Sequence, residues 1–560
     1  TTQQNVEAAR AAAVRPHIIM LLVDDFGWAN AGWHRDPTAP KANEVQTPNM
    51  NYLVRTGIEL DRHYAFKFCS PTRSALQSGR NPIHVNMENI SPASYNEADP
   101  VGGFQGIPRN MTGIAEKLTS AGYETHMVGK WDAGMATRDH TPLGRGYRTS
   151  LNYFHHCNDF WTSTQGTCKE RGLLGKFRAI VDMWDTAGPS HQNGTSTCGR
   201  VDQHVDAVSA KGCSTCYTAL NDPIPYIEYG PFAGSAYNDD IFMARMLAEI
   251  NGHDPSVPLF YFWAPHAVHI PLQVNQSYMD EFAFVDNKYR RAYHAMVKHL
   301  DDHVGDLVAT LTKKGMYDNT LIAMSSDNGG PVYLQGTSGA NNWPLRGGKM
   351  NNWEGGVRVN AFVSGGVVPT ARRGTKEEGL TAVWDWYATF CALAGVDPTD
   401  QKAARAGLPP IDSVDLWPLL SGQNKTSPRV VIPLGSPPIN FDGTPSIAPV
   451  TGLIMDEWKI LIGNVAQATW QGPQYPNATT AKITTLFVDN CTTPLKRACL
   501  FNIFTDPTEH VDLYESMPDK VTQMLAELKR HNATVYQPNR GQASPAACES
   551  ALYDYGGVWG

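Results

Sequence analysis

The fold of this 560-residue chain is decided by the stretch His17-Ile18-Ile19-Met20-Leu21-Leu22-Val23-Asp24-Asp25-Phe26-Gly27. Residues 18–23 are all apolar and lack the polar–apolar alternation of a half-exposed strand. Such a run predicts a strand buried on both faces, as in a parallel sheet. In open α/β sheets, ligands bind at the carboxyl ends of the strands. The stretch therefore predicts an α/β fold with a functional edge at Asp24.

The rest of the chain repeats this pattern until about residue 425. Further buried strands are predicted at 258–263 and 320–324, and helices at 112–121, 239–251 and 288–314. Strands that alternate with helices favour an α/β sandwich around a large, mostly parallel sheet. After residue 422, short strand patterns (430–432, 458–462 and 500–503) and a helix at 519–530 predict a small antiparallel sheet with one helix. We expect a flexible tail over residues 1–15, a catalytic domain over 16–425 and a C-terminal α+β subdomain over 426–560.

Two acidic pairs follow predicted buried strands. Asp24 and Asp25 end the first strand, and Asp327 and Asn328 follow the strand at 320–324. Three carboxylates and an amide oxygen make an all-oxygen site suited to a hard cation such as Ca²⁺ or Mg²⁺. The alternative is two ordinary turns, because Asp, Asn and Gly are common turn residues.

A cysteine stands where a helix is predicted to begin. Pro71 suits the first helical position, Ser70 suits the N-cap, and Gly79 suits the end of the helix. A thiol at Cys69 would then face the unpaired N–H groups of the first turn, which favour an anion or a nucleophile. The alternative is a structural half-cystine.

The stretch Cys69-Ser70-Pro71-Thr72-Arg73, followed by Ser74-Ala75-Leu76-Gln77-Ser78-Gly79-Arg80, resembles the signature of type I sulfatases. The resemblance implies an alkaline-phosphatase-like fold and oxidation of the cysteine to Cα-formylglycine by a formylglycine-generating enzyme. One hydroxyl of the hydrated aldehyde would attack the sulfur of a sulfate ester, and the other would then expel the sulfate. It also implies one Ca²⁺ per chain, held by Asp24, Asp25, Cys69, Asp327 and Asn328.

Three further segments resemble sulfatase motifs: Gly129-Lys130-Trp131, Val268-His269-Ile270-Pro271-Leu272-Gln273-Val274, and Leu345-Arg346-Gly347-Gly348-Lys349 with Trp353-Glu354-Gly355-Gly356-Val357-Arg358. The resemblance implies that Lys130, His269 and Lys349 bind the sulfate. Lys349, with His269, would help to protonate the leaving alcohol. Arg73 would brace the formylglycine. Taken singly, each lysine reads as a surface residue and the histidine as a loop residue, but their joint order along the chain favours the catalytic interpretation.

The chain departs from the family after Trp131, where Asp132 replaces the usual histidine. That histidine is assigned to the release of sulfate. Asp132 is a candidate base, because a carboxylate beside a metal and two lysines is expected to be ionised. The alternatives are that His126 or His140 reaches the site, or that the release step is slow.

The resemblance extends from His17 to about Glu515 and is closest to the arylsulfatase B-like, N-acetylgalactosamine-4-sulfatase-like branch. It implies a sulfated sugar or aryl sulfate as the substrate. Aromatic residues that would line a sugar site, or equally pack in the core, are Tyr153, His155, His156, Trp161 and Trp343. Two rivals remain: a phosphodiesterase or phosphatase of the same superfamily, and a catalytically weak glycan-binding glycoprotein.

Composition agrees with an extracellular or lysosomal hydrolase. The net charge is −8 without a basic stripe, which argues against nucleic acid, and no apolar run is long enough for a membrane span. We expect a free thiol at Cys391, a bridge between Cys491 and Cys499, and bridges among the remaining six cysteines: Cys157, Cys168, Cys198, Cys213, Cys216 and Cys548. Eight Asn-x-Ser/Thr sequons begin at Asn89, Asn110, Asn193, Asn275, Asn424, Asn477, Asn490 and Asn532.

Overall fold

The computed structural model describes the following residues: 15–90, 94–161, 163–171, 177–186, 199–200, 216–218, 237–332, 337–439, 445–472, 474–480 and 487–553. Several sequence predictions lie outside these residues: positions 1–14 of the expected tail, the sequon at Asn193, and Cys198 and Cys213. The side chains of Cys168, Cys216 and Cys548 also lie outside the described part. No helix in the described part of the chain is long and apolar enough to cross a membrane.

The core of the molecule is a ten-stranded sheet, as expected for the α/β class. Its order is β10 (Gly199–Arg200), β9 (Trp184–Thr186), β6 (Thr149–Tyr153), β5 (Glu124–Lys130), β12 (Leu259–Ala264), β1 (His17–Val23), β14 (Thr320–Ser326), β15 (Ala361–Ser364), β2 (Ile58–Leu60) and β16 (Thr375–Glu377). The five strands from β6 to β14 run parallel, and β9 and β15 pair antiparallel at either side.

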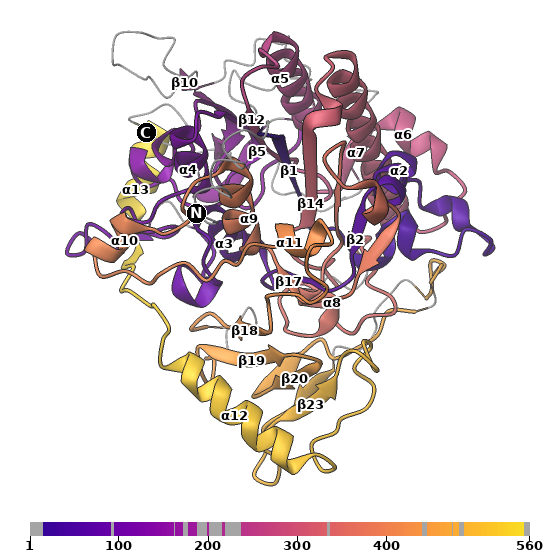
Figure 1. Cartoon of the computed structure of the whole chain (residues 1–560), viewed down its shortest axis with the longest axis vertical. Helices are drawn as coiled ribbons and strands as arrows, with labels where there is room; N and C mark the ends of the chain where they lie inside the picture. Colours follow the sequence, from indigo (N-terminus) through magenta and orange to yellow (C-terminus); the bar gives the residue numbers. More distant parts are fainter. Residues whose placement is uncertain are drawn as a thin grey trace, which may run out of the picture.

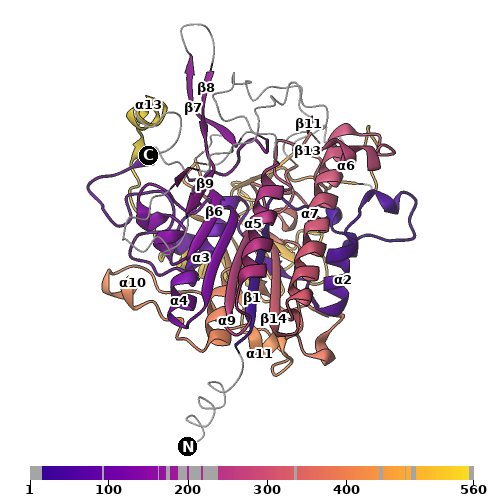
Figure 2. The same cartoon turned by 90° about the horizontal axis from the view of Figure 1, so that it is seen from above.

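Helices cover both faces of the sheet (Figures 1 and 2). Ile18, Met20 and Leu22 of β1 point into one core with α3 (Cys69–Ser78), α4 (Ile114–Ser120) and α9 (Asp385–Ala394). The alternate residues of β1 point into a second core with α2 (Pro48–Thr56), α5 (Asn238–Gly252) and α7 (Lys288–Lys313). Burial on both faces explains why this strand has no polar–apolar alternation.

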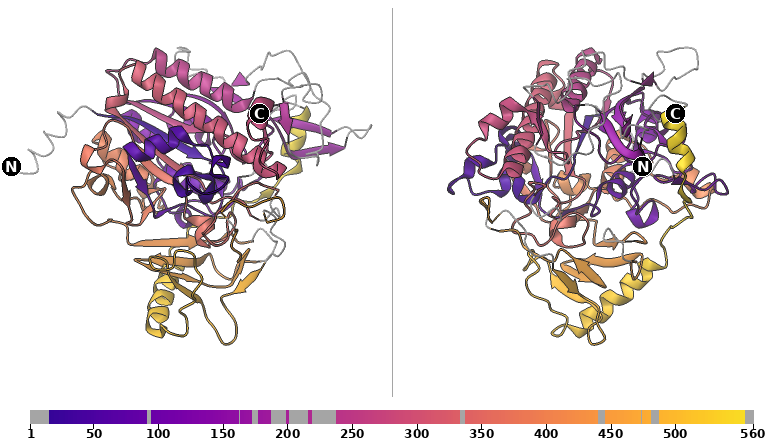
Figure 3. Two further views of the ribbon diagram at one scale, coloured as in Figure 1. Left: turned by 90° about the vertical axis from the view of Figure 1, so that its right-hand side faces the viewer. Right: turned by 180° about the vertical axis from the view of Figure 1, so that it is seen from behind.

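The C-terminal part forms a second, smaller sheet at the lower end of the molecule in Figures 1 and 3. It is antiparallel, in the order β18 (Val431–Gly435), β19 (Val450–Met455), β20 (Trp458–Leu461) and β23 (Cys499–Asn502), and α12 (Pro518–Asn532) packs against it. The chain then returns to the larger part, where β24 (Gln542–Ala543) pairs with β4 (Ser94–Tyr95) before α13 (Pro545–Tyr553).

The remaining elements are short. The two-stranded ribbons are β7 (Thr164–Arg171) with β8 (Phe177–Val181), β11 (Cys216–Thr218) with β13 (Gln273–Asn275), β17 (Thr381–Ala382) with β3 (His63–Tyr64), and β21 (Asn464–Ala466) with β22 (Val488–Asn490). The short helices are α6 (Gln276–Glu281), α8 (Glu354–Val357), α10 (Gln401–Arg405) and α11 (Trp417–Leu420).

The cysteine expectations are confirmed in part. Cys491 and Cys499 form a disulfide, and Cys391 is a buried free thiol in α9. The bridge expected at Cys157 is wrong, because its thiol is free.

Candidate active site

The site lies at the carboxyl edge of the central strands, where β5, β12, β1 and β14 are neighbours. Asp24 follows β1, Asp327 follows β14, and Lys130 is the last residue of β5. Parallel neighbours end at the same edge, so residues about 300 positions apart meet: the Asp25 backbone N–H donates to Asp327 Oδ1 at 3.3 Å. All of these side chains are buried.

Helix α3 presents Cys69 to this edge. The helix begins at Cys69 rather than after Ser70, so the predicted Ser70 N-cap is wrong; Pro71 still lies in the first turn, where its missing N–H has no cost. Gly79 ends the helix at a φ of 68°, as predicted. The Cys69 thiol lies 3.5 Å from Asp24 Oδ1. Burial and the carboxylates of Asp24 and Asp327 raise the pKa of this thiol well above its usual range, so the helix N-terminus does not make it a thiolate.

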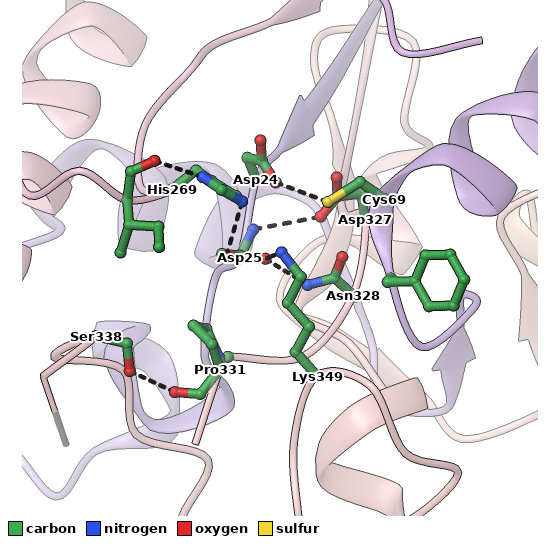
Figure 4. Close-up of polar contacts among 12 residues, drawn as sticks. Asp24, Asp25, Cys69, His269, Asp327, Asn328, Pro331, Ser338 and Lys349 are labelled. Atoms are coloured by element: carbon green, nitrogen blue, oxygen red, sulfur yellow. Dashed lines mark hydrogen bonds and ion pairs between the residues drawn. The ribbon is translucent and has the colours of Figure 1, made fainter. Parts of the chain in front are cut away.

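Asp24, Asp25 and Asp327 each form an ion pair with a buried cation. Lys130 Nζ lies 2.7 Å from Asp24 Oδ2. Lys349 Nζ lies 2.6 Å from Asp25 Oδ1, as Figure 4 shows. Arg73 donates from Nε and a terminal nitrogen to Asp327 at 3.0 and 2.8 Å. It also donates to the Lys130 carbonyl at 3.0 Å, so this arginine holds β14, β5 and α3 together.

The oxygen-rich side of the site fits a hard cation. Asp25 Oδ2 and Asn328 Oδ1 are buried and have no hydrogen-bond partner in the described part of the chain. Buried polar atoms are almost always paired, so these two orphaned oxygens indicate a missing partner with positive charge. Ligand atoms of Asp24, Asp25, Cys69 and His269 also lie within 4.8 Å of one another.

His269 faces the same space in a defined tautomer. Its Nδ1 lies 2.6 Å from the carbonyl oxygen of Ile270, which can only accept, so Nδ1 carries the proton. Burial and the ammonium groups of Lys349 and Lys130 lower the pKa of His269 well below its usual range. The ring is therefore neutral, and the lone pair of Nε2 lies 3.5 Å from Asp25 Oδ2.

Asp132 lies against Ser70, the residue that follows Cys69. It is fully buried, its Oδ1 accepts a hydrogen bond from the Ser70 hydroxyl at 2.7 Å, and its Oδ2 lies 3.7 Å from Lys130 Nζ. Burial raises the pKa of Asp132 to about 6, against the lowering by Lys130 and Arg73. The carboxylate is therefore mostly ionised at neutral pH, although its pKa lies above the ordinary value.

The alternative bases do not contact the site residues. His126 bonds Thr149 and lies against Glu249, while His140 bonds Thr137 and packs on Phe104. Among the proposed sugar-site aromatic residues, Tyr153 and Trp161 are buried in the core beneath α5.

Sequence reasoning missed three residues around the site. His266 is fully buried with neither ring nitrogen bonded within the described residues, and its ring stacks on Phe160 at 3.6 Å. Tyr293 of α7 accepts from the Gly27 backbone N–H and donates to the Asp25 carbonyl, which fixes the loop after β1. Ser70 holds Asp132. The close spacing of His266 and His269 is a usable sequence signal, whereas the other two contacts exist only in the fold.

Comparison with known proteins gives one family. A family model described as "Sulfatase" matches residues 16–396. Arylsulfatase J of Mus musculus is 29% identical over 99% of this chain and 81% of its own length. N-acetylgalactosamine-6-sulfatase of Homo sapiens is 27% identical over 74% of this chain and 67% of its own. The arylsulfatase B-like branch stays a prediction.

Solved structures share the fold. Ps i-CgsB, crystallised with k-i-k-neocarrahexaose, superimposes with a TM-score of 0.65 at 22% identity and covers 97% of this chain and 98% of its own. The PsFucS1 sulfatase from Pseudoalteromonas sp. gives a TM-score of 0.63 at 22% identity over 95% of this chain and 92% of its own. The α/β architecture with a large, mostly parallel sheet is therefore that of known sulfatase structures.

Proposed function

The chain belongs to the sulfatase family and is a sulfuric ester hydrolase, and from this premise we propose that it acts through a formylglycine made from Cys69. The observation that carries the proposal is the placement of Cys69 Sγ at the first turn of α3, 3.5 Å from Asp24, beside the ion pairs of Lys130 and Lys349. Because its thiol pKa is raised, an unmodified Cys69 would be a poor nucleophile. Conversion to formylglycine supplies a hydrated aldehyde, whose hydroxyl is the nucleophile and whose second hydroxyl allows release.

We propose that one Ca²⁺ is held by Asp24, Asp25, Asp327 and Asn328, together with the group at position 69. The donor set is all oxygen once Cys69 is oxidised, and the two orphaned oxygens of Asp25 and Asn328 support it. When bound, the cation lowers the pKa of a nearby hydroxyl and attracts the sulfate.

The charges of the site suit a sulfate ester. Four buried carboxylates (Asp24, Asp25, Asp132 and Asp327) face three buried cations (Arg73, Lys130 and Lys349), so this set alone would repel an anion. A divalent cation reverses the sign of the balance. Lys130 and Lys349 are then available to bind sulfate oxygens, and their ammonium groups stabilise charge in a dry site.

Proton transfer is divided between two sides of the site. On one side, Lys349 donates a proton to the leaving alcohol. The neutral His269 orients that leaving group through Nε2. On the other side, Asp132 accepts the proton of the second hydroxyl as the sulfate is released. Ser70 holds the Asp132 carboxylate in place. Asp132 adopts a φ of 48°, a region that Asp, Asn and His enter more readily than most residues, so a histidine fits the same backbone.

We propose a sulfated sugar or polysaccharide as the substrate class. Support comes from the relatives named above and from a structure of BT4656 with D-glucosamine-2-N,6-O-disulfate, which shares the fold at a TM-score of 0.58 and 14% identity. We further propose passage through the secretory pathway, with a formylglycine-generating enzyme as the partner during synthesis. The Cys491–Cys499 disulfide and the exposed sequon residues Asn424 and Asn477 support it.

The test begins with the mass of the tryptic peptide of residues 68–73 from reduced, alkylated protein. We expect the aldehyde at position 69, and turnover of an aryl sulfate but not of the matching aryl phosphate. The control is Cys69→Ala, which cannot be converted. A fully alkylated Cys69 in protein that nevertheless hydrolyses the sulfate would contradict the proposal, and so would faster turnover of the phosphate.

A further inference from the structure

A second cluster of metal-ligand side chains lies between α5 and α7, away from the catalytic residues. His299 and His303 are four residues apart on α7, so both rings project from one face of that helix. Asp240 stands in the first turn of α5. One ligand atom from each of the three residues lies within 4.8 Å of the others.

Both imidazoles converge on one carboxylate oxygen. His299 Nε2 lies 2.7 Å from Asp240 Oδ1, and His303 Nε2 lies 3.2 Å from the same atom. Two ligands at the corners of a zinc tetrahedron are about 3.3 Å apart, given bonds of about 2.0 Å. The three residues therefore need only a small outward shift to admit a cation in place of the two hydrogen bonds.

The ring of His299 is already oriented for this role. It is almost fully buried, and the rings of Tyr237 and Tyr278 each pack edge-on against it at 5.0 Å between centroids. The Asp240 side chain is 45% exposed, so a cation and its water ligands have access from solvent. A preoriented imidazole, a second imidazole whose ring centroid lies 4.3 Å from it, and an accessible carboxylate match an open, three-ligand site.

We propose that Asp240, His299 and His303 form a second metal site that binds a divalent transition ion of the zinc class. Two imidazoles and one carboxylate favour such ions over Ca²⁺, which prefers oxygen ligands. The site is distinct from the all-oxygen cluster at Cys69 and does not depend on sulfate hydrolysis.

A cation here would join two helices that support the catalytic loops. Asp239, the neighbour of Asp240, accepts from the backbone N–H groups of His266 and Ala267 at 2.7 and 2.9 Å, just before His269. Tyr293 on α7 bonds the loop that carries Asp25. The role of the ion is therefore to stabilise one wall of the active site, and it needs no part in the chemistry.

The test titrates Co²⁺ into the full-length protein, without a histidine tag, after chelator treatment and dialysis into excess Ca²⁺. Calcium fills the oxygen-rich site, so Co²⁺ reports on nitrogen ligands through its visible d–d absorption. We expect one equivalent of Co²⁺ with the intense bands of a four-coordinate N/O site, bleached by Zn²⁺, and a rise in melting temperature with Zn²⁺.

His303→Gln should weaken the binding of Co²⁺ by roughly 100-fold or more, since loss of a ligand costs at least as much as loss of an outer partner. The matched control is His253→Gln, which removes another imidazole–carboxylate pair, His253 with Glu124 at 2.9 Å, and should leave the spectrum unchanged. Absence of Co²⁺ bands in the wild-type protein would overturn the proposal and leave the cluster as a hydrogen-bonded network. A His303→Gln spectrum equal to that of the wild type would overturn it as well.

Discussion

Two buried charge clusters in this molecule have similar composition and opposite states of completion. The catalytic cluster leaves Asp25 Oδ2 and Asn328 Oδ1 without partners. The second cluster joins the smaller sheet to helix α8 of the larger part: Lys459 of β20 lies 2.9 Å from Glu354 of α8 and 2.8 Å from Glu509, and all three side chains are almost fully buried. Tyr64 donates to the other oxygen of Glu354 at 2.9 Å. The first arrangement can accept a cation and an anion. In the second, every carboxylate oxygen has a partner within the protein, and Glu509 Oε1 has the ion pair with Lys459 but no hydrogen bond within the described residues.

The largest effect is expected on stability, when the cluster around Lys459 is broken. Lys459→Met leaves two buried carboxylates without their shared cation, so we expect the free energy of unfolding to fall by about 3–5 kcal/mol. Chemical denaturation measures it, with Lys376→Met as the control, because the Lys376 side chain is 45% exposed and its partners Glu59 and Asp61 also pair with His34 and Arg358. A loss no greater than that of the control would show that the junction does not depend on this ion pair.

The corresponding change in the catalytic cluster should lower the rate of sulfate hydrolysis more than the stability of the fold. Lys349→Met removes a cation that is available to the sulfate, so we expect kcat/KM for an aryl sulfate to fall by about 10³-fold, the upper range for one electrostatic group. The melting temperature should fall less than in Lys459→Met. Steady-state kinetics and thermal unfolding of both variants measure the contrast, and equal losses of stability would contradict it.

A smaller effect is expected at Asp132. Asp132→Asn keeps the shape and the contact with Ser70 but removes the base, so we expect sulfate release to slow by about 10²-fold. Single-turnover cleavage should change little, so that a rapid burst of alcohol precedes a slow steady state. Asp132→His should alter release more than substrate binding. Unchanged single-turnover and steady-state rates in both variants would exclude a role for this side chain.

The smallest effect is a pH dependence of the junction. Burial raises the pKa of Glu509 from its ordinary value near 4.5 to about 7, despite the attraction of Lys459. The folded protein therefore binds more protons than the unfolded chain between these values, and this contribution to stability is lost as pH rises from about 4.5 to 7. We expect Glu509→Gln to flatten that part of the melting-temperature profile. A profile parallel to that of the wild type would refute it.

Local pattern was sufficient for much of the fold. The run of residues 18–23 predicted the end of β1 at Val23 to the residue and its start at His17 to within one residue, because a strand buried on both faces leaves an uninterrupted apolar run. The strand at 320–324 extends to Ser326, where polar side chains bond backbone groups of the following turn. The Cys491–Cys499 bridge was also predictable, because its two cysteines are close in the chain.

Long-range contacts decided what the pattern could not show. Ser70 was predicted to cap α3, yet its hydroxyl bonds Asp132, which arrives from the end of β5. Burial raises the pKa of both Cys69 and Asp132. At Cys69 it outweighs the effect of the helix N-terminus, and at Asp132 it outweighs the neighbouring cations.

Sequence alone determined the α/β class, the order of the motifs and the identity of the chemistry, because these depend on residue type and spacing along one segment. Only the tertiary structure decided which oxygens of the site lack partners, which histidines stay away from it, and that Asp240 meets His299 and His303. The physical reason is that the pairing, burial and net charge around each side chain depend on neighbours tens or hundreds of residues away in the sequence. The order of the strands in the sheet determines which residues become neighbours.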